Sequence, residues 1–237
     1  MEGCDLLKRI INDELSGWKA WEILWLVSAC TVIFILSVYW HDTPMGIISA
    51  TTGVACVVCT GKGKLMAYVF GTVNVVLYAI ISLKAKYYGE VMLNLIYYFP
   101  MEFYGFYIWM KHMDPETKEV EKRWMSWKAR GLSVVGIVVS TFLYGLLLKH
   151  MGDALPFIDA FTTAASVIAM IVSVWMYVEQ WLIWIAIDVM TVAMWYIAFR
   201  NGNDSIATLL MWVVYLGNAI IMYFKWKKEA DHARKAL

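Results

Sequence analysis

The sequence predicts an all-α integral membrane protein with eight transmembrane helices. Three observations lead to this fold class: 61% of the 237 residues are hydrophobic, only 16% are charged, and the mean hydropathy is +0.61. A soluble domain carries roughly a quarter charged residues and has no need of long apolar runs. The apolar excess of this chain therefore has to face lipid.

Eight apolar segments come close to the length of about 20 residues that a membrane-crossing helix needs. Turn and charge signals separate them, for example at residues 41–44, 61–64 and 201–204. We expect helices over residues 21–40, 45–60, 66–83, 90–110, 131–149, 157–177, 181–199 and 205–224. The long hydrophilic stretch at 111–130 is expected to be a cytoplasmic loop within a single membrane domain, 1–237.

The N-terminal residues 1–20 carry charges throughout, which makes them too polar for the apolar core of a cleavable signal peptide. Their apolar residues recur at helical spacing. Two interpretations stay open: a helix that lies in the membrane interface, or a short cytosolic capping helix.

The distribution of basic residues predicts the topology. With eight spans, Lys84, Lys86, Lys149 and Arg200 fall on one side, and the other 16 of the 20 Lys and Arg residues fall on the side of both termini. Basic residues favour the cytoplasmic side of a membrane. Both termini are therefore expected in the cytoplasm, including a tail at 227–237, and an odd number of spans would scramble this asymmetry.

A weak internal repeat divides the eight segments. Residues 51–53 (TTG) match residues 162–164 (TTA), and Asn74 matches Asp188, at offsets of 111 and 114. The repeat predicts a 1+3+1+3 arrangement: an extra helix at 21–40, a first three-helix bundle at 45–110, a linker helix at 131–149 and a second bundle at 157–226. Parallel three-helix repeats are a known carrier plan, with the substrate site between the repeats and transport by rocking of one against the other.

One polar stripe is predicted in the fourth segment. Asn94, Tyr98 and Glu102 follow at intervals of four and share a helix face, with Pro100 among them. Ionisable groups inside a membrane usually face a cavity or a partner, and proline frees backbone carbonyls that can line one. A binding face is one interpretation, and a structural kink with hydrogen bonds between helices is the other.

A second candidate face lies in the seventh segment, where Trp181, Trp184 and Asp188 are spaced at i, i+3 and i+7. Two indole rings beside a carboxylate suit a flat cationic ring, through stacking and cation–π attraction. Trp181 lies near the start of the segment, so it is equally typical of an interfacial aromatic belt.

Three further residues complete the predicted binding set: Asn74, Tyr215 and Asn218. The two amides are equally suited to joining helices. No catalytic set, phosphate-binding loop or paired metal-ligand motif is found, and Cys56 and Cys59 are interpreted as small buried apolar residues. We therefore expect no enzyme, no cofactor, no metal and no nucleic-acid partner.

Several stretches of the sequence resemble the PnuC family of bacterial vitamin transporters, over about residues 45–226. They are residues 70–78 (FGTVNVVLY), 87–94 (YYGEVMLN), 104–109 (YGFYIW), 156–160 (PFIDA) and 179–188 (EQWLIWIAID). The resemblance implies a fold similar to sugar transporters of the SWEET type and a homotrimer in the bacterial cytoplasmic membrane. It also implies uptake of nicotinamide riboside by facilitated diffusion, with trapping through phosphorylation by a separate cytosolic kinase.

The resemblance assigns Trp181, Trp184 and Asp188 to the ligand site, together with Asn94, Tyr98 and Glu102. Some family members carry amides where this sequence has Glu102 and Asp188. The alternatives are another vitamin such as thiamine, and a proton-coupled carrier that uses one of these carboxylates. A membrane enzyme or sensor is the remote alternative, for which the sequence supplies neither a catalytic set nor a sizeable soluble output domain.

Overall fold

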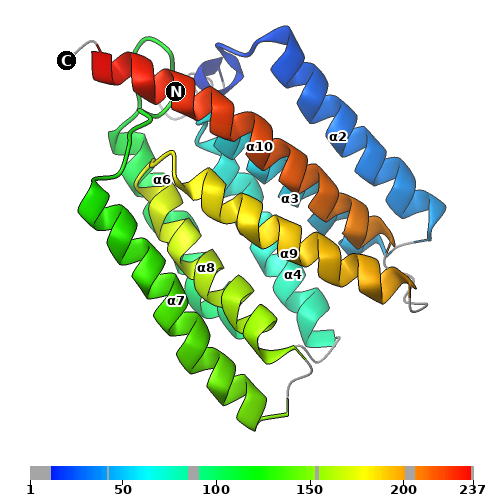
Figure 1. Cartoon of the computed structure of the whole chain (residues 1–237). Coiled ribbons are helices and arrows are strands. Elements are labelled where there is room, and N and C mark those ends of the chain that lie inside the picture. The colour runs from blue at the N-terminus through cyan, green and yellow to red at the C-terminus, as the bar shows by residue number, and fades with distance from the viewer. Residues whose placement is uncertain (1–11, 42, 85–90, 153–154, 201–205, 236–237) are drawn as a thin grey trace. The chain divides into compact units, whose positions relative to one another are not determined.

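The computed structural model describes residues 12–41, 43–84, 91–152, 155–200 and 206–235. Every regular element within these residues is a helix, which confirms the all-α part of the predicted fold class (Figure 1). The labelled helices are α2 (Ala20–Tyr39), α3 (Pro44–Lys62), α4 (Met66–Lys84), η1 (Leu93–Tyr98), α6 (Phe99–Lys111), α7 (Trp127–His150), α8 (Pro156–Val174), α9 (Gln180–Arg200) and α10 (Ile206–Lys235).

Six helical spans among the described residues are long and apolar enough to cross a membrane, so the chain is a multi-pass membrane protein. They are Ala20–Tyr39, Pro44–Lys62, Met66–Leu83, Trp127–His150, Pro156–Val174 and Leu209–Lys235. The helix α9 has 21 residues, and η1 continues directly into α6 over residues 93–111. Each of the eight predicted segments thus corresponds to helix in the structure, although α7 begins earlier than expected and α10 runs without a break to Lys235.

The chain divides into two compact units, Met1–Glu121 and Lys122–Leu237. In the first unit α3 packs against α2 and α4, and α4 also packs against η1 and α6. In the second unit α7 lies along α8, α8 packs on α9, and α9 packs on α10 (Figure 1). Small side chains face inward from α8, where Ala160, Ala164, Ala165 and Ala169 are buried, and this lets neighbouring helices approach closely.

Pro100 explains why the fourth predicted segment is divided. Proline has no N–H to donate and its ring clashes with the carbonyl four residues earlier. The chain widens into the π-helix η1 directly before it, where the N–H of Phe99 donates to the carbonyl of Asn94, five residues back. The predicted irregularity is therefore a single wide segment rather than a break in the helix.

The end of α3 and the end of α8 have the same backbone conformation. Gly63 and Met176 both adopt a positive φ, of 83° and 58°. In each case the next residue donates its N–H to the carbonyl five residues earlier, Lys64 to Cys59 and Tyr177 to Val172, both at 3.1 Å. Such an end satisfies carbonyls that would otherwise lack partners. The shared geometry is consistent with the internal repeat, because it falls at corresponding helix ends in the two units.

The two lysines on either side of Gly63 are buried, with 2% of Lys62 and none of Lys64 exposed. The Lys62 ammonium contacts the carboxylates of Glu22 at 2.7 Å and Glu119 at 2.8 Å, and donates to the Gly17 carbonyl at 2.6 Å. Sequence reasoning treats these lysines mainly as topology signals. The structure adds a packing role, because a buried ammonium needs anions and carbonyls around it.

Lys64 and Glu14 hold the N-terminal segment against the start of α4. Lys64 donates to the carbonyls of Asp13 and Lys118, both at 2.8 Å. The Glu14 carboxylate accepts from the N–H groups of Leu65 at 3.2 Å and Met66 at 3.0 Å, which the start of a helix leaves without partners. Burial raises the pKa of Glu14 and lowers the pKa of Lys64 from their usual values. Residues 13–17 therefore serve as a cap on the first unit.

The second unit uses a buried carboxylate in the corresponding place. Glu179, directly before α9, accepts from the N–H of Met125 at 3.1 Å and from Nε of Arg130 at 2.6 Å. The Trp124 indole donates to Asp231 of α10 at 2.9 Å. These bonds attach the segment before α7 to the beginning of α9 and to the end of α10.

The burial of Lys62 leads to a stability prediction. We expect Lys62→Met to lower the free energy of unfolding by about 3 kcal/mol, because it leaves Glu22 and Glu119 without their cation. The measurement is the temperature at which the detergent-solubilised protein loses its monodisperse peak in size-exclusion chromatography. Lys128→Ala, at an exposed position of α7, is the matched control and should change little. Equal melting of the two variants would contradict the assigned role of Lys62.

Candidate binding residues in the two units

The predicted binding residues fall into two groups, one in each unit. The first unit holds Asn74 in α4, Asn94 and Tyr98 in η1, and Glu102 in α6. The second unit holds Trp181, Trp184 and Asp188 in α9, and Tyr215 and Asn218 in α10. The groups are described separately below.

Asn74 joins two helices of the first unit. Its amide nitrogen donates to the Ser49 carbonyl at 2.7 Å and contacts the Ser49 hydroxyl at 3.3 Å. These bonds link α4 to α3, which is the helix-joining interpretation of this residue. A contact of Asn74 with a ligand stays a prediction.

The stripe in the fourth segment lies on the inner side of its helix. Asn94 and Glu102 are buried and Tyr98 is partly buried, whereas Ile96 and Phe103, on other faces of the helix, are exposed. The π-helix does not disrupt the shared face, because residues four apart stay nearly aligned in either helix type. The three polar groups therefore face the interior of the first unit, as the spacing predicts.

Glu102 of α6 and Tyr68 of α4 each lie against a glycine of the other helix, and we call these two residues the crossed pair. A Cβ added to Gly71 of α4 would lie 2.5 Å from a carboxylate oxygen of Glu102. A Cβ added to Gly105 of α6 would overlap the Tyr68 ring, 2.6 Å from its hydroxyl oxygen. Both side chains thus depend on the missing side chains of these glycines, at matched i, i+3 positions in the two helices.

Neither polar end of this crossed pair has a hydrogen-bond partner among the described residues. The Tyr68 hydroxyl is buried without a hydrogen-bond partner. The Glu102 carboxylate has no hydrogen-bond partner either, and Glu102 is only 7% exposed. A buried polar group without a partner is destabilising by about 1–3 kcal/mol, and more when it is charged. Groups of this kind inside a membrane mark a functional position until shown otherwise.

Trp181 is buried against a second tryptophan of its own unit. Its ring meets that of Trp226 in α10 edge-to-face, with centroids 5.6 Å apart. The Trp181 indole nitrogen and both polar atoms of the neighbouring Gln180 side chain are buried without partners among the described residues. Trp181 therefore packs α9 onto α10, and its contact with a ligand stays a prediction.

Trp184 and Asp188 occupy different surroundings on the same helix. Trp184 is partly buried against a small apolar cluster formed by Ala165, Ala169 and Ile187. Asp188 is 3% exposed, and its carboxylate has no hydrogen bond or ion pair among the described residues. On α10, Asn218 is buried, and Tyr215 is partly buried edge-to-face with Trp212 at 5.4 Å. Asp188 is thus a buried carboxylate with the indole of Trp184 one helical turn before it.

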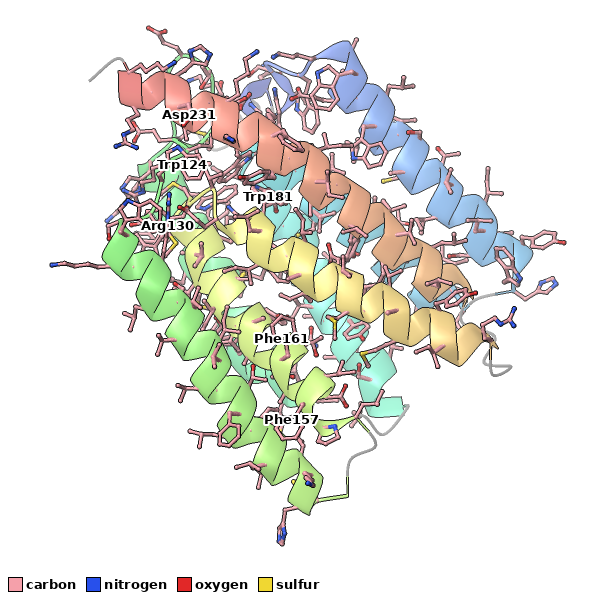
Figure 2. The ribbon with its side chains drawn as sticks, viewed as in Figure 1. Trp124, Arg130, Phe157, Phe161, Trp181 and Asp231 are labelled. Atoms are coloured by element: carbon pink, nitrogen blue, oxygen red, sulfur yellow. The ribbon has the colours of Figure 1, made fainter. Side chains whose placement is uncertain are left out.

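A cavity of about 400 Å³ opens in the second unit, and its lining contains none of the nine predicted residues. Trp124, Arg130 and Asp231 lie close together at this place (Figure 2). The full lining is Trp124, Arg130, Glu179, Leu182, Tyr223, Asp231 and Arg234. Arg130 and Asp231 already bond to Glu179 and Trp124, so the polar groups there serve mainly to hold the segment before α7.

Sequence reasoning missed Tyr68, Gly71 and Gly105. Tyr68 lies two residues into an apolar segment, and no other candidate binding residue shares its helix face at i+3 or i+4. The two glycines were the available signal, since glycine inside a membrane helix often marks a close approach between helices. Their pairing with Tyr68 and Glu102 required the packing of α4 on α6.

Comparison with known proteins identifies close relatives. The family model described as nicotinamide mononucleotide transporter matches residues 43–228. The nicotinamide riboside transporter PnuC of Neisseria mucosa is 39% identical over 90% of this chain and 82% of its own length. The PnuC protein of Haemophilus influenzae is 29% identical over 94% of this chain and 96% of its own. The crystal structure of the vitamin B3 transporter PnuC superposes with a TM-score of 0.81 and 36% identity, covering 93% of this chain and 97% of that one.

The crossed pair leads to a prediction about packing. We expect Gly105→Ala to destabilise the protein by about 1–3 kcal/mol, because its Cβ would overlap the Tyr68 ring in a close-packed interface. Gly131→Ala in α7 is the matched control, since its Cβ would meet nothing within 4 Å, and it should be neutral or stabilising. Thermal unfolding of both variants in detergent is the measurement. A Gly105→Ala protein that melts like the wild type would contradict the close approach of α4 and α6.

Proposed function

Because this chain belongs to the PnuC transporter family, we propose that it takes up nicotinamide riboside across a bacterial cytoplasmic membrane by facilitated diffusion. The family consists of transporters, so the chain is not an enzyme. In the proposed pathway the riboside equilibrates through the carrier, and a separate cytosolic kinase phosphorylates and traps it. This function makes the chain the entry point for a precursor of nicotinamide cofactors.

The observation that carries the proposal is the carboxylate of Asp188, which is buried in α9 one helical turn after Trp184 and has no hydrogen-bond or ion-pair partner among the described residues. Nicotinamide riboside contains a flat pyridinium ring with a positive charge. An indole face attracts such a ring, and a carboxylate in a region of low dielectric constant compensates its charge. An ionised carboxylate buried alone is strongly disfavoured, so a cationic ligand supplies the partner that the described part of the chain does not.

The remaining parts of the proposal concern architecture and assembly. We propose eight transmembrane helices in a 1+3+1+3 order, with both termini in the cytoplasm, where the basic residues gather. In this arrangement α2 is the extra helix and α7 the linker helix, with three-helix bundles on either side of α7 in the sequence. The homotrimeric state is proposed from family membership alone.

The role of Asp188 can be tested by calorimetric titration of the purified protein. We expect Asp188→Asn to weaken nicotinamide riboside binding about tenfold or more, since a charge-assisted interaction is lost. Trp184→Ala should weaken binding as well. The thermal stability of Asp188→Asn should be equal or higher, because the substitution removes an unpaired buried charge. Glu116→Gln, at an exposed loop position, is the control.

Titration with thiamine and riboflavin in the same series addresses the ligand identity. Tighter binding of thiamine than of nicotinamide riboside would favour the related-vitamin alternative. Wild-type affinity for nicotinamide riboside in both α9 variants would remove these residues from the proposed site.

Facilitated diffusion predicts that transport has no driving ion. In proteoliposomes, labelled nicotinamide riboside should reach the same internal and external concentration with or without an imposed pH gradient. Accumulation should appear only when a nicotinamide riboside kinase and ATP are enclosed. Accumulation driven by the pH gradient alone would instead identify a proton-coupled carrier, with Glu102 or Asp188 as the proton-binding group.

A further inference from the structure

The last turns of α10 carry an open groove that the proposed transport function does not use. The groove has a volume of about 320 Å³, and all the residues that line it belong to the second unit, on the part of α10 drawn in red in Figure 1. The lining consists of Phe224, Lys227, Lys228, Asp231, His232 and Lys235. Three lysines against one carboxylate give the groove a net positive charge, so the ligand that it suits is an anion.

The groove follows one face of the helix. Four of its residues stand one above another, at intervals of four, three and four along α10: Phe224, Lys228, Asp231 and Lys235. The opposite face carries Trp226, which is fully buried and packs edge-to-face on Trp181 of α9 with ring centroids 5.6 Å apart. Because this packing fixes the rotation of α10 within the second unit, the face with the lysines is turned away from α9.

The cations of the groove are free, whereas the acidic residues of the same turns are engaged. The three lysines are exposed and form no hydrogen bond or ion pair among the described residues. The Glu229 carboxylate lies 2.8 Å from the Lys122 ammonium, and Asp231 accepts a hydrogen bond from the Trp124 indole at 2.9 Å. An anion can therefore approach the lysines without breaking an ion pair that they already form.

The groove begins where the apolar part of α10 ends. The 30 residues of this helix extend over about 45 Å, whereas the hydrocarbon layer of a bilayer is about 30 Å thick. Phe224 is 63% exposed and is the last of the large exposed apolar side chains of α10. Lys227 and Lys228 follow three and four residues later and are its neighbours on the helix surface. The groove thus has an apolar end at the depth of acyl chains and a cationic end at the depth of headgroups.

We infer that this groove binds an anionic phospholipid, with the headgroup phosphate beside Lys227 and Lys228 and the upper part of an acyl chain against Phe224. Basic pockets beside membrane-spanning helices bind anionic headgroups, and each lysine near the surface adds to the attraction. Phe224 favours a lipid over a soluble phosphate, because a soluble phosphate has no apolar part to cover the ring. The bound lipid holds the end of α10 at the membrane surface, a role separate from the transport of the substrate.

The test is the double variant Lys227→Gln/Lys228→Gln of the whole chain. Native mass spectrometry of the detergent-solubilised protein measures the binding of phosphatidylglycerol, which is anionic, and of phosphatidylcholine, which is zwitterionic. We expect the wild type to prefer phosphatidylglycerol and the variant to bind it about tenfold more weakly, because two cations next to the phosphate are lost. Phosphatidylcholine binding should change little. Equal affinity of wild type and variant for phosphatidylglycerol would overturn the inference.

Two further variants separate the groove from the net charge of the protein. Lys227→Arg/Lys228→Arg keeps both charges and should keep the wild-type preference. Lys111→Gln/Lys128→Gln removes two charges at exposed positions outside the groove and should also bind phosphatidylglycerol like the wild type. A loss as large in this control as in the groove variant would overturn the inference, because the net charge would then account for the binding.

A third substitution and a competitor distinguish a lipid from a free phosphate. Phe224→Ala should weaken phosphatidylglycerol binding, since the contact with the acyl chain is lost. Inorganic phosphate should not displace the lipid from the wild type. Displacement by inorganic phosphate, with Phe224→Ala binding like the wild type, would identify a free-phosphate site and overturn the assignment to a lipid. Nicotinamide riboside binding should be the same in all these variants, so the proposed function stands or fails independently.

Discussion

Polar groups next to lipid have to find partners within the protein, and this constraint shapes both units of the chain. Water is not available in the hydrocarbon region, so helices satisfy their own backbone and only their ends are left to be capped. In the first unit the carboxylate of Glu14 caps the start of α4, and the ammonium of Lys64 binds two loop carbonyls. In the second unit Glu179 takes the corresponding place by accepting from Met125. Buried charges here complete the helix ends.

The ends of α3 and α8 show the same use of internal partners in both units. Gly63 and Met176 end their helices with a positive φ, and in each unit a residue of the segment between α6 and α7 donates to the carbonyl of that helix end. Val120 donates to Gly63 at 3.0 Å and Arg123 donates to Met176 at 3.2 Å. Met176 lacks the freedom of glycine and is held by complete burial. Related backbone geometry thus persists in the two units although the residues that form it differ.

Against this background the polar atoms without partners stand out. The ends of α3 and α8 and the start of α4 have hydrogen-bond partners. The Tyr68 hydroxyl, the Trp181 indole nitrogen and the Asp188 carboxylate, in contrast, lie buried in the helices without a hydrogen-bond partner among the described residues. A carrier that releases its substrate must tolerate an empty state in which binding groups are unsatisfied. Some stability is given up at such positions, and a ligand that supplies the missing partners is bound in preference to one that does not.

The sequence by itself determined the all-α membrane class, the places of the helices and the polar candidates, because apolar runs and helical spacing are local properties of the chain. The stripe of Asn94 and Glu102 and the burial of Asp188 followed from this spacing. Only the tertiary structure decided which polar groups are already paired. In the folded chain Asn74 donates a hydrogen bond to Ser49, Trp181 packs on Trp226, and Lys62 is buried next to carboxylates. The tertiary structure also placed Tyr68 against Gly105 and Glu102 against Gly71. Pairing depends on which helices touch and how closely, and no periodicity within one segment contains that information.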